Sequence, residues 1–199
     1  MARPSPPRDP DRNIAPGTRP RRGESGDANA LWRYERHRRR NLMAEPGPHE
    51  VVLVLERLKA DFNVPKIFRS AEAFGAHAVH LIDVAPFDPA PAKGGFKHVP
   101  ARFHEHLDDC LRELLAADYT LLAMDPFADT LIGDLALPRR SAFILGHELR
   151  GLSEEVLGDQ RVHRVRIPQW GSVDSLNVAV AASVALYEYA RQHGGSSRA

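Results

Sequence analysis

The residues from Arg166 to Arg191 constrain the fold of this chain more than any other stretch. A short β-branched run, Val162 to Ile167, leads through a polar loop into a segment that shows no broad polar face from Val178 to Ala190. A surface helix has such a face, so we expect a buried helix that is central to the core although it lies near the C-terminus. Three short polar side chains precede it: Asp174, Ser175 and Asn177.

These polar residues at the helix start have two interpretations. Asp174 or Ser175 can act as the N-cap of the helix. Alternatively, the free backbone N–H groups of the first turn can hold a ligand. Chemistry alone leaves both open.

Composition predicts one folded domain with a basic extension. The 199 residues are 43% hydrophobic, and the chain lacks a run of roughly 18 to 20 apolar residues that could span a membrane. The N-terminus is charged and proline-rich without an apolar signal core, so we expect a cytoplasmic protein with no membrane partner. The single cysteine, Cys110, excludes an internal disulfide and has apolar neighbours at helical spacing, which favours a buried hydrophobic role.

Residues 1–40 carry most of the positive charge. They hold eleven arginines against five acidic residues, about +6, which leaves about −5 for the remaining 159 residues because the whole chain carries +1. Arginine binds phosphates and aromatic rings stack on bases, so this extension, with Trp32 and Tyr34, suits a polyanion. A solvated tail without a partner is the alternative. The candidate RNA contacts here are Arg33, Arg36, Arg38, Arg39 and Arg40.

The predicted organisation has three parts. Residues 1–45 are a basic, disordered RNA-binding extension, with a short helix over 31–43. Residues 46–193 form the α/β domain, and residues 194–199 are a flexible C-terminus. Continuous apolar runs predict parallel strands buried on both faces, and amphipathic stretches predict helices. The strands are expected at 51–55, 78–83, 119–124 and 142–145, and the helices at 63–74 and 103–117.

Two polar features stand apart from these buried elements. In the first helix, Ile67, Ala71 and Phe74 form the buried stripe, so Arg69 is free to meet a ligand or a neighbouring subunit, or it pairs with Glu72. The loop over residues 85–100 is equally consistent with an RNA-contacting loop and with an ordinary surface connection. Its candidate contacts are Lys93 and Lys97, which flank Gly94-Gly95-Phe96.

A glycine follows the strand at residues 142–145 directly. Gly146, with Gly151 five residues later, is the arrangement by which α/β proteins bring backbone close to a ligand at the carboxyl end of a strand. Ten histidines prompt a search for metal ligands. The pairs His77/His80 and His104/His106 lack supporting Cys or acidic ligands at a suitable spacing, so the sequence predicts no metal.

Three segments in this order resemble the motifs of the SpoU-type (TrmH-like) ribose methyltransferases of the SPOUT superfamily. The first contains Asn63 and Arg69 in NVPKIFRSAEAFG, the second is GHELRGLS from Gly146, and the third is Ile167-Pro168 followed by SLNV from Ser175. The resemblance covers residues 49–191. It implies an α/β fold with a parallel sheet and a deep C-terminal trefoil knot, S-adenosylmethionine as cofactor, and a homodimer.

The resemblance also implies roles for individual residues. Gly146, Ile167 and Leu176 match the cofactor-binding positions, and the polar positions around the methyl acceptor are matched by Asn63, Arg69, Glu148, Ser175 and Asn177. Arg69 matches the central catalytic residue. Because a guanidinium with a pKa above about 12 is a poor base, we expect it mainly to clamp a phosphate and stabilise the developing oxyanion. Glu148, Ser175 and Asn177 are then expected to orient Arg69, the hydroxyl and the methionine end of the cofactor.

The implied function is methylation of a ribose 2'-hydroxyl in structured RNA, with tRNA ahead of rRNA because a basic extension stands where some rRNA-directed relatives have a folded RNA-binding domain. Two positions depart from the pattern: Pro65, where a small residue is usual, and His147, where Asn is common. A non-catalytic RNA-binding or ribosome-assembly factor on the same scaffold is the alternative function. Methylation of a base nitrogen is a third, weaker possibility.

Overall fold

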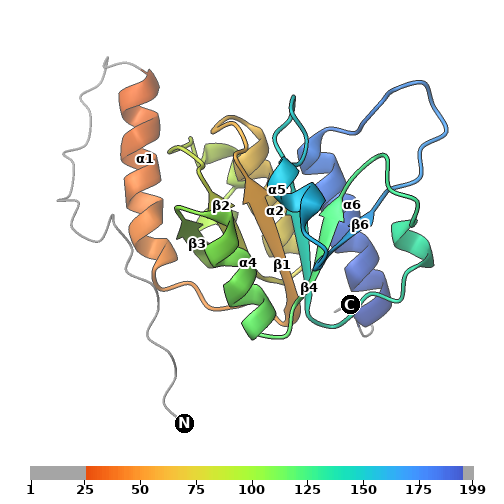
Figure 1. Ribbon diagram of the computed structural model, residues 1–199. Helices are drawn as coiled ribbons and strands as arrows, with labels where there is room; N and C mark the ends of the chain where they lie inside the picture. The colour runs from red at the N-terminus through yellow and green to blue at the C-terminus, as the bar shows by residue number, and fades with distance from the viewer. Residues whose placement is uncertain (1–25, 195–199) are drawn as a thin grey trace, which may run out of the picture.

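A parallel sheet organises the fold (Figure 1). The computed structural model describes residues 26–194, except the side chain of Asp27, so the predictions for residues 1–25 and 195–199 lie outside it. Within the described range six strands pair in the order β3-β2-β1-β5-β4-β6, and every pairing is parallel. The strands are β1 (His49–Glu56), β2 (Ala76–Ile82), β3 (Ala101–His104), β4 (Thr120–Met124), β5 (Ser141–Leu145) and β6 (Val162–Val165).

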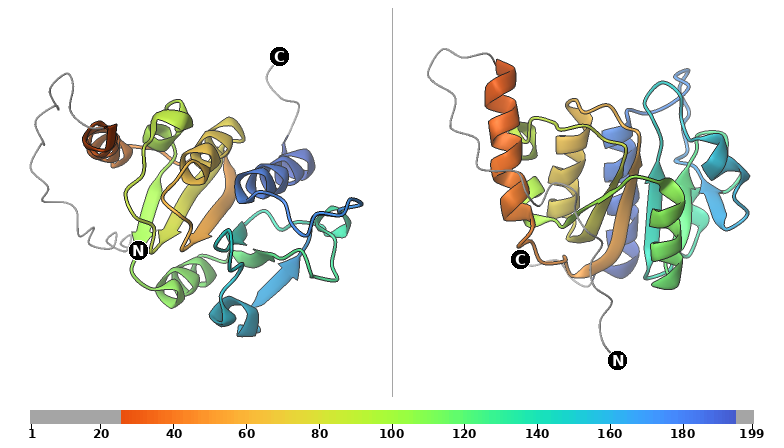
Figure 2. Two further views of the ribbon diagram at one scale, coloured as in Figure 1. Left: turned by 90° about the horizontal axis from the view of Figure 1, so that it is seen from above. Right: turned by 60° about the vertical axis from the view of Figure 1, so that its left-hand side comes forward.

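Helices cover both faces of the sheet (Figure 2). Buried residues of α2, α3 and α6 join one core cluster, and those of α4 and α5 join the other. None of the described helices is long and apolar enough to cross a membrane. The helical elements are α1 (Gly26–Asn41), α2 (Asn63–Ala73), η2 (Ala90–Ala92), α3 (Gly95–His98), α4 (Leu107–Ala116), η3 (Ile132–Asp134), α5 (Glu154–Gly158) and α6 (Val178–His193).

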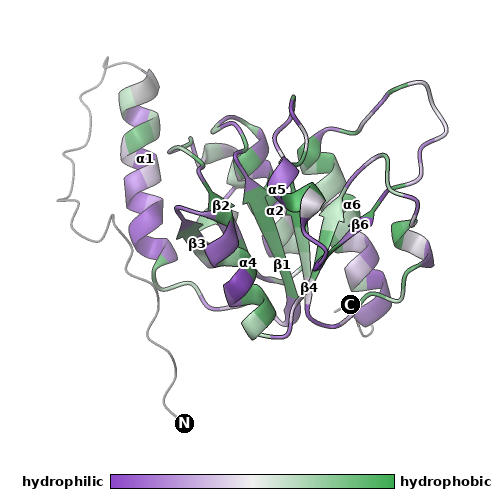
Figure 3. Ribbon diagram, viewed as in Figure 1, coloured by the Kyte–Doolittle hydropathy of each residue, from purple (hydrophilic) through white to green (hydrophobic). Residues whose placement is uncertain are grey.

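The central strand β1 confirms the prediction of a strand buried on both faces. Val51, Leu53 and Leu55 pack into the cluster with α2 and α6, whereas Val52 and Val54 pack into the cluster with α4. Alternate side chains of a strand point to opposite faces, so a continuous apolar run is needed where both faces are covered. Figure 3 shows this apolar strand at the middle of the sheet.

The helix predicted at residues 103–117 begins later than expected. Phe103 belongs to strand β3, which pairs with β2, and α4 starts at Leu107. The segment 85–100 is also more ordered than a plain loop, since it contains η2 and α3 and buries Phe87 and Phe96. A four-residue edge strand has too little alternation to be distinguished in the sequence from the amphipathic helix that follows it.

Helix α1 corrects the prediction of a disordered extension over residues 26–45. It begins at Gly26 rather than Leu31, and its Tyr34 is buried against the rings of Phe87 and Phe96, at centroid distances of 5.3 and 5.6 Å. At its end, the buried amide of Asn41 donates to the carbonyls of Phe96 and Val99 and accepts from the N–H of Ala101. Residues 26–41 are therefore part of the folded domain.

The C-terminal helix α6 is only partly buried. Ala182, Ala185 and Leu186 are completely covered, but Val180 and Tyr187 are 49% and 56% exposed. The expectation that its apolar composition places it wholly in the core is thus wrong for one face, which is apolar and open to solvent. Its N-cap is Asn177, whose Oδ1 accepts from Ala179 N at 3.0 Å, and not Asp174 or Ser175.

Candidate functional site

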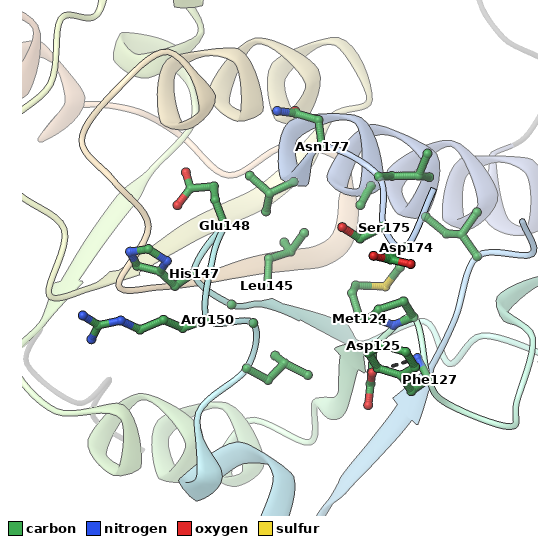
Figure 4. A pocket seen from close by; sticks show the side chains of 18 of the residues that line it. Met124, Asp125, Phe127, Leu145, His147, Glu148, Arg150, Asp174, Ser175 and Asn177 are labelled. Carbon is green, nitrogen blue, oxygen red and sulfur yellow. Dashed lines mark hydrogen bonds between the residues drawn. The ribbon is translucent and has the colours of Figure 1, made fainter. Parts of the chain in front are cut away.

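A cavity of about 620 Å³ lies at the carboxyl ends of β4 and β5 (Figure 4). Its walls come from three segments that follow strands, namely 124–127 after β4, 145–152 after β5, and 167–181, which contains the start of α6. Ligands of parallel α/β sheets bind outside the carboxyl ends of the strands, so the cavity is where the topology favours a ligand site. It contains the predicted residues Gly146, Glu148, Ile167, Ser175, Leu176 and Asn177.

The loop after β5 is compact because of its glycines. A Cβ on Gly146 would lie 2.3 Å from the carbonyl oxygen of Gly151, so only glycine fits there. Gly151 has a φ of 69°, and its N–H donates to His147 O at 2.8 Å. The loop is anchored by Ser153 N, which donates to the buried carboxylate of Glu56 at the end of β1. Backbone groups are thereby held at the cavity wall.

A chain of three polar side chains lies beside the cavity, and two of its members, Glu148 and Asn177, line the cavity wall. Asn63, the first residue of α2, donates from Nδ2 to Glu148 Oε1 at 3.0 Å and accepts at Oδ1 from Asn177 Nδ2 at 3.1 Å. Asn177 in turn caps α6. Residues 63, 148 and 177, far apart in the sequence, therefore form one hydrogen-bonded unit that ties together two helix starts and the Gly146 loop.

Glu148 is the ionised member of this unit. Partial burial disfavours the charge, but hydrogen bonds from Asn63 Nδ2 and from the backbone N–H of Lys59 outweigh it and hold the pKa of Glu148 below its ordinary value. A carboxylate with a lowered pKa is a weak proton acceptor. It is suited to fixing its neighbours in place rather than to taking up a proton.

Polar residues that the sequence analysis missed lie at the other end. Asp125, at the end of β4, accepts from Arg164 Nε at 2.6 Å and from the N–H of Phe127. Gln169 Oε1 is buried and lacks a hydrogen-bond partner in the described part of the chain. Asp125 could have been found from the sequence, because it is a polar residue directly after a buried strand. Nothing in the sequence indicated that Gln169 lies at the site.

Arg69 is not brought into the cavity. It is exposed on α2, and within residues 26–194 it has no hydrogen bond or ion pair, including the suggested pair with Glu72. In the described chain Glu148 contacts Asn63 and does not contact Arg69, so the expected orienting of Arg69 stays a prediction. Pro65 is buried in the first turn of α2 and removes no polar group from the unit.

The predicted RNA contacts divide into two groups. Arg33 forms an ion pair with Asp88 at 2.7 Å and stays half-exposed, so its RNA contact remains a prediction. Arg38 is buried over the ring of Phe103 at 3.6 Å, where it stabilises the attachment of α1, and it is corrected as an RNA contact because it is covered. Tyr34, being buried, is likewise not free to stack on bases. The exposed or half-exposed members of the predicted set are Arg33, Arg36, Arg39, Arg40, Lys93 and Lys97.

Three of these basic residues, Arg36, Arg40 and Lys97, lie around His37 where α1 meets α3. Burial lowers the pKa of His37, and the positive charges of Lys97, Arg40 and Arg36 lower it further. That mutual effect places the four residues within electrostatic reach of one another.

The sheet order, the glycine loop and the cavity define an α/β protein with a ligand site at the carboxyl ends of its strands. Its sequence matches the family model described as the SpoU rRNA Methylase family over residues 50–187. The chain therefore belongs to this family, which confirms the resemblance found in the three motifs.

Two curated relatives and one solved structure illustrate the similarity. The chain is 35% identical over 161 residues to 23S rRNA (guanosine-2'-O-)-methyltransferase RlmB of Bordetella pertussis, covering 75% of this chain and 62% of that protein. It is 32% identical over 147 residues to tRNA (guanosine(18)-2'-O)-methyltransferase of Thermus thermophilus, covering 72% and 75%. The SpoU methyltransferase AviRb of Streptomyces viridochromogenes, crystallised with AdoMet, superposes with a TM-score of 0.67 at 26% identity, covering 74% and 62%.

Proposed function

We propose that this chain transfers a methyl group from S-adenosylmethionine to a ribose 2'-hydroxyl of structured RNA. The observation that carries the proposal is the cavity beside the hydrogen-bonded unit of Asn63, Glu148 and Asn177. Membership of the family and the names of the relatives support the reaction class. We propose tRNA as the first substrate to test and rRNA as the second, since the curated relatives include enzymes named for each.

The cavity fits the cofactor. Its volume of about 620 Å³ suits a nucleoside-sized ligand. Ile167 and Leu176 offer apolar walls for the adenosine, and the backbone at Gly146 can approach it closely. The unpaired oxygen of Gln169 needs an N–H donor, and the cofactor carries two amino groups. We therefore keep Gly146, Ile167 and Leu176 as the proposed cofactor-binding residues.

The cofactor supplies an electrophilic methyl group on a sulfonium ion. The protein's part is to place a ribose hydroxyl in line with it and to exclude competing water. Ser175 and Asn177 lie at the cavity wall and can hydrogen-bond the hydroxyl. Glu148 fixes Asn63 in place. Because the pKa of Glu148 is lowered, we assign this residue a positioning role, and the proton of the hydroxyl is released to solvent water.

Arg69 acts on the substrate in this proposal. Its exposed, unpaired guanidinium can hold a phosphate in two parallel hydrogen bonds and stabilise the developing oxyanion. Loss of one such donor costs about 10²–10³ in kcat. We expect a loss of that size for Arg69→Ala and a smaller but clear loss for Arg69→Lys, measured as methyl transfer to tRNA and rRNA transcripts. Arg112→Lys, at an exposed position of α4, is the matched control. Near-normal turnover of Arg69→Lys would refute bidentate binding of the phosphate.

We propose that a second copy of this chain covers the exposed face of α2 and α6. A groove there is lined by Phe74, Val180, Val184 and Tyr187, together with Lys66, Ser70 and Ser183. Val180 and Tyr187 are about half exposed, which is unusual for adjacent large apolar residues on a monomer surface. Tyr187→Glu is expected to give a monomer in sedimentation velocity, while Tyr187→Phe keeps the dimer. A wild-type protein that sediments as a monomer at micromolar concentration contradicts the proposal.

We propose that Arg36, Arg40 and Lys97 form a cationic patch that binds the RNA backbone together with Arg39 and Lys93. Removing one cation that neutralises a phosphate should reduce the salt slope of the binding constant by about one. Arg36→Glu/Arg40→Glu is therefore expected to weaken RNA binding and flatten its salt dependence, with cofactor affinity unchanged. Arg112→Glu on α4 is the matched charge reversal. An unchanged salt slope removes the patch from the mechanism.

A further inference from the structure

Three side chains that the methyl-transfer proposal does not use converge beneath α4. His80 comes from the middle of β2, His104 from the end of β3, and Cys110 from the first turns of α4. Their ligand atoms all lie within 4.8 Å of one another. None of the three lines the cavity at the carboxyl ends of β4 and β5, so this cluster is separate from the proposed active site.

The cluster is buried and well ordered by its own contacts. His80 Nδ1 lies 2.9 Å from His104 Nε2 and 3.4 Å from Cys110 Sγ. His80 is 2% exposed and Cys110 is fully covered, while His104 is half-buried at the sheet edge. Two nitrogens and one sulfur thus point into one small space, with the third residue opening toward solvent.

We propose that His80, His104 and Cys110 form a structural zinc site. Zinc prefers nitrogen and sulfur ligands in a tetrahedron, with bonds of about 2.0–2.1 Å to nitrogen and about 2.3 Å to sulfur. Those bonds separate two nitrogens by about 3.3 Å and a nitrogen from a sulfur by about 3.6 Å. The observed separations of 2.9 Å between the two nitrogens and 3.4 Å between His80 and Cys110 need only small outward shifts to match. The ligand atoms of the third pair, His104 and Cys110, lie within 4.8 Å and can close on an ion placed between them.

Zinc binding releases one proton from the cluster, that of the Cys110 thiol. The imidazole that donates the hydrogen bond must move its one hydrogen to its other nitrogen, by exchange with solvent, so that both rings stay neutral and each offers a lone pair to the ion. The Cys110 thiol loses its proton to solvent and becomes the thiolate ligand. Without zinc, the same three groups are simply hydrogen-bonded to one another, which is the competing explanation of the cluster.

The fourth ligand position faces the sheet edge. Glu113, one turn beyond Cys110 on α4, is close enough to affect both His104 and Cys110 electrostatically. Within residues 26–194 its carboxylate makes one hydrogen bond or ion pair, a long one of 3.4 Å to Arg102 NH1. Glu113 or a water molecule can therefore complete the tetrahedron. The site would tie the edge strand β3 to β2 and α4, which is a structural role.

Cobalt titration of the full-length protein, stripped with a chelator, tests the site. Co²⁺ is expected to bind with one-to-one stoichiometry and to give both the visible bands of a tetrahedral ion and a near-ultraviolet thiolate charge-transfer band. Equimolar Zn²⁺ should remove both. Cys110→Ser should lose the charge-transfer band, and His104→Gln should bind at least tenfold more weakly, whereas His106→Gln, on the exposed neighbouring histidine, should behave as wild type.

Two results overturn the proposal. One is a folded wild-type protein that gives no charge-transfer band at a cobalt excess, which identifies the cluster as a hydrogen-bonded core network. The other is a charge-transfer band that persists in Cys110→Ser, or a cobalt affinity of His104→Gln equal to that of the wild type. The wild-type spectrum decides the question even if a variant fails to fold, and the readout is independent of methyl transfer.

Discussion

Replacement of Asn63 by alanine tests the hydrogen-bonded unit beside the cavity. The change removes the bond to Glu148 and the bond from Asn177. Neutral hydrogen bonds contribute about 0.5–1.5 kcal/mol and those to charged groups about 1.5–3 kcal/mol. Since these side chains are partly exposed and water can replace Asn63, the lower ends apply, and we expect a loss of about 2 kcal/mol. That corresponds to a fall in Tm of about 4–8 °C for a domain of this size.

The same change should raise the pKa of Glu148. Asn63 helps to hold the pKa of Glu148 below its ordinary value. The ionised carboxylate therefore stabilises the folded protein at any pH above its pKa in the unfolded chain, about 4.3. This stabilisation is lost as the pH falls through the lower pKa of the folded protein. Asn63→Ala should therefore show a weaker dependence of unfolding free energy on pH below about 4.5. Asn63→Asp keeps an acceptor for Asn177 but places a second carboxylate against Glu148, and should raise the pKa further.

The assay is a titration of the Glu148 carboxyl carbon by ¹³C NMR, combined with urea denaturation at several pH values. Glu72→Gln, an exposed residue of the same helix, serves as the control and should leave both readings unchanged. If the Glu148 titration curves of Asn63→Ala and Asn63→Asp superpose on that of the wild type, the contact between residues 63 and 148 does not form and the reasoning fails.

Three further changes test other parts of the structure. Gly146→Ala places a Cβ 2.3 Å from Gly151 O, so the loop must move. Calorimetry should show at least tenfold weaker binding of S-adenosylhomocysteine, and an unchanged Kd would contradict the cofactor site. The hydrogen bond from Arg33 lowers the pKa of Asp88, so the stability that this pair gives to the folded protein is lost as the pH falls below about 3.9. Arg33→Gln should raise the pKa of Asp88 in an NMR titration. Tyr34→Ala removes a buried ring and should cost about 3 kcal/mol in urea denaturation, with faster proteolysis within residues 26–41; equal protease resistance would show that α1 is held elsewhere.

The sequence was sufficient for the elements whose pattern is strong over many residues. The apolar run of β1, the stripe of α2 and its end at Gly75, and the strand before Gly146 are all found where they were predicted. These features depend on local periodicity and on glycine geometry, which the sequence carries directly. The three motifs then placed the chain in its family. The deep C-terminal knot stays a prediction.

What the sequence could not show depends on contacts between distant residues. The attachment of α1 through Tyr34 and Asn41 is tertiary, and an arginine-rich segment resembles a free tail until its buried partners are known. The exposed face of α6 could not be separated from its buried face because both are apolar. Likewise, His80 and Cys110 lie 30 residues apart, so spacing rules for metal ligands did not connect them.

Identification of the methylated nucleoside tests the central claim most directly. The full-length protein is incubated with labelled S-adenosylmethionine and separately with tRNA and rRNA that lack its modification, and the digested nucleosides are analysed by mass spectrometry, with Arg69→Ala in parallel. We expect one 2'-O-methylated nucleoside, in the tRNA fraction, that is absent with Arg69→Ala. A base-methylated product, or cofactor binding without any methylated nucleoside in either RNA, would contradict it.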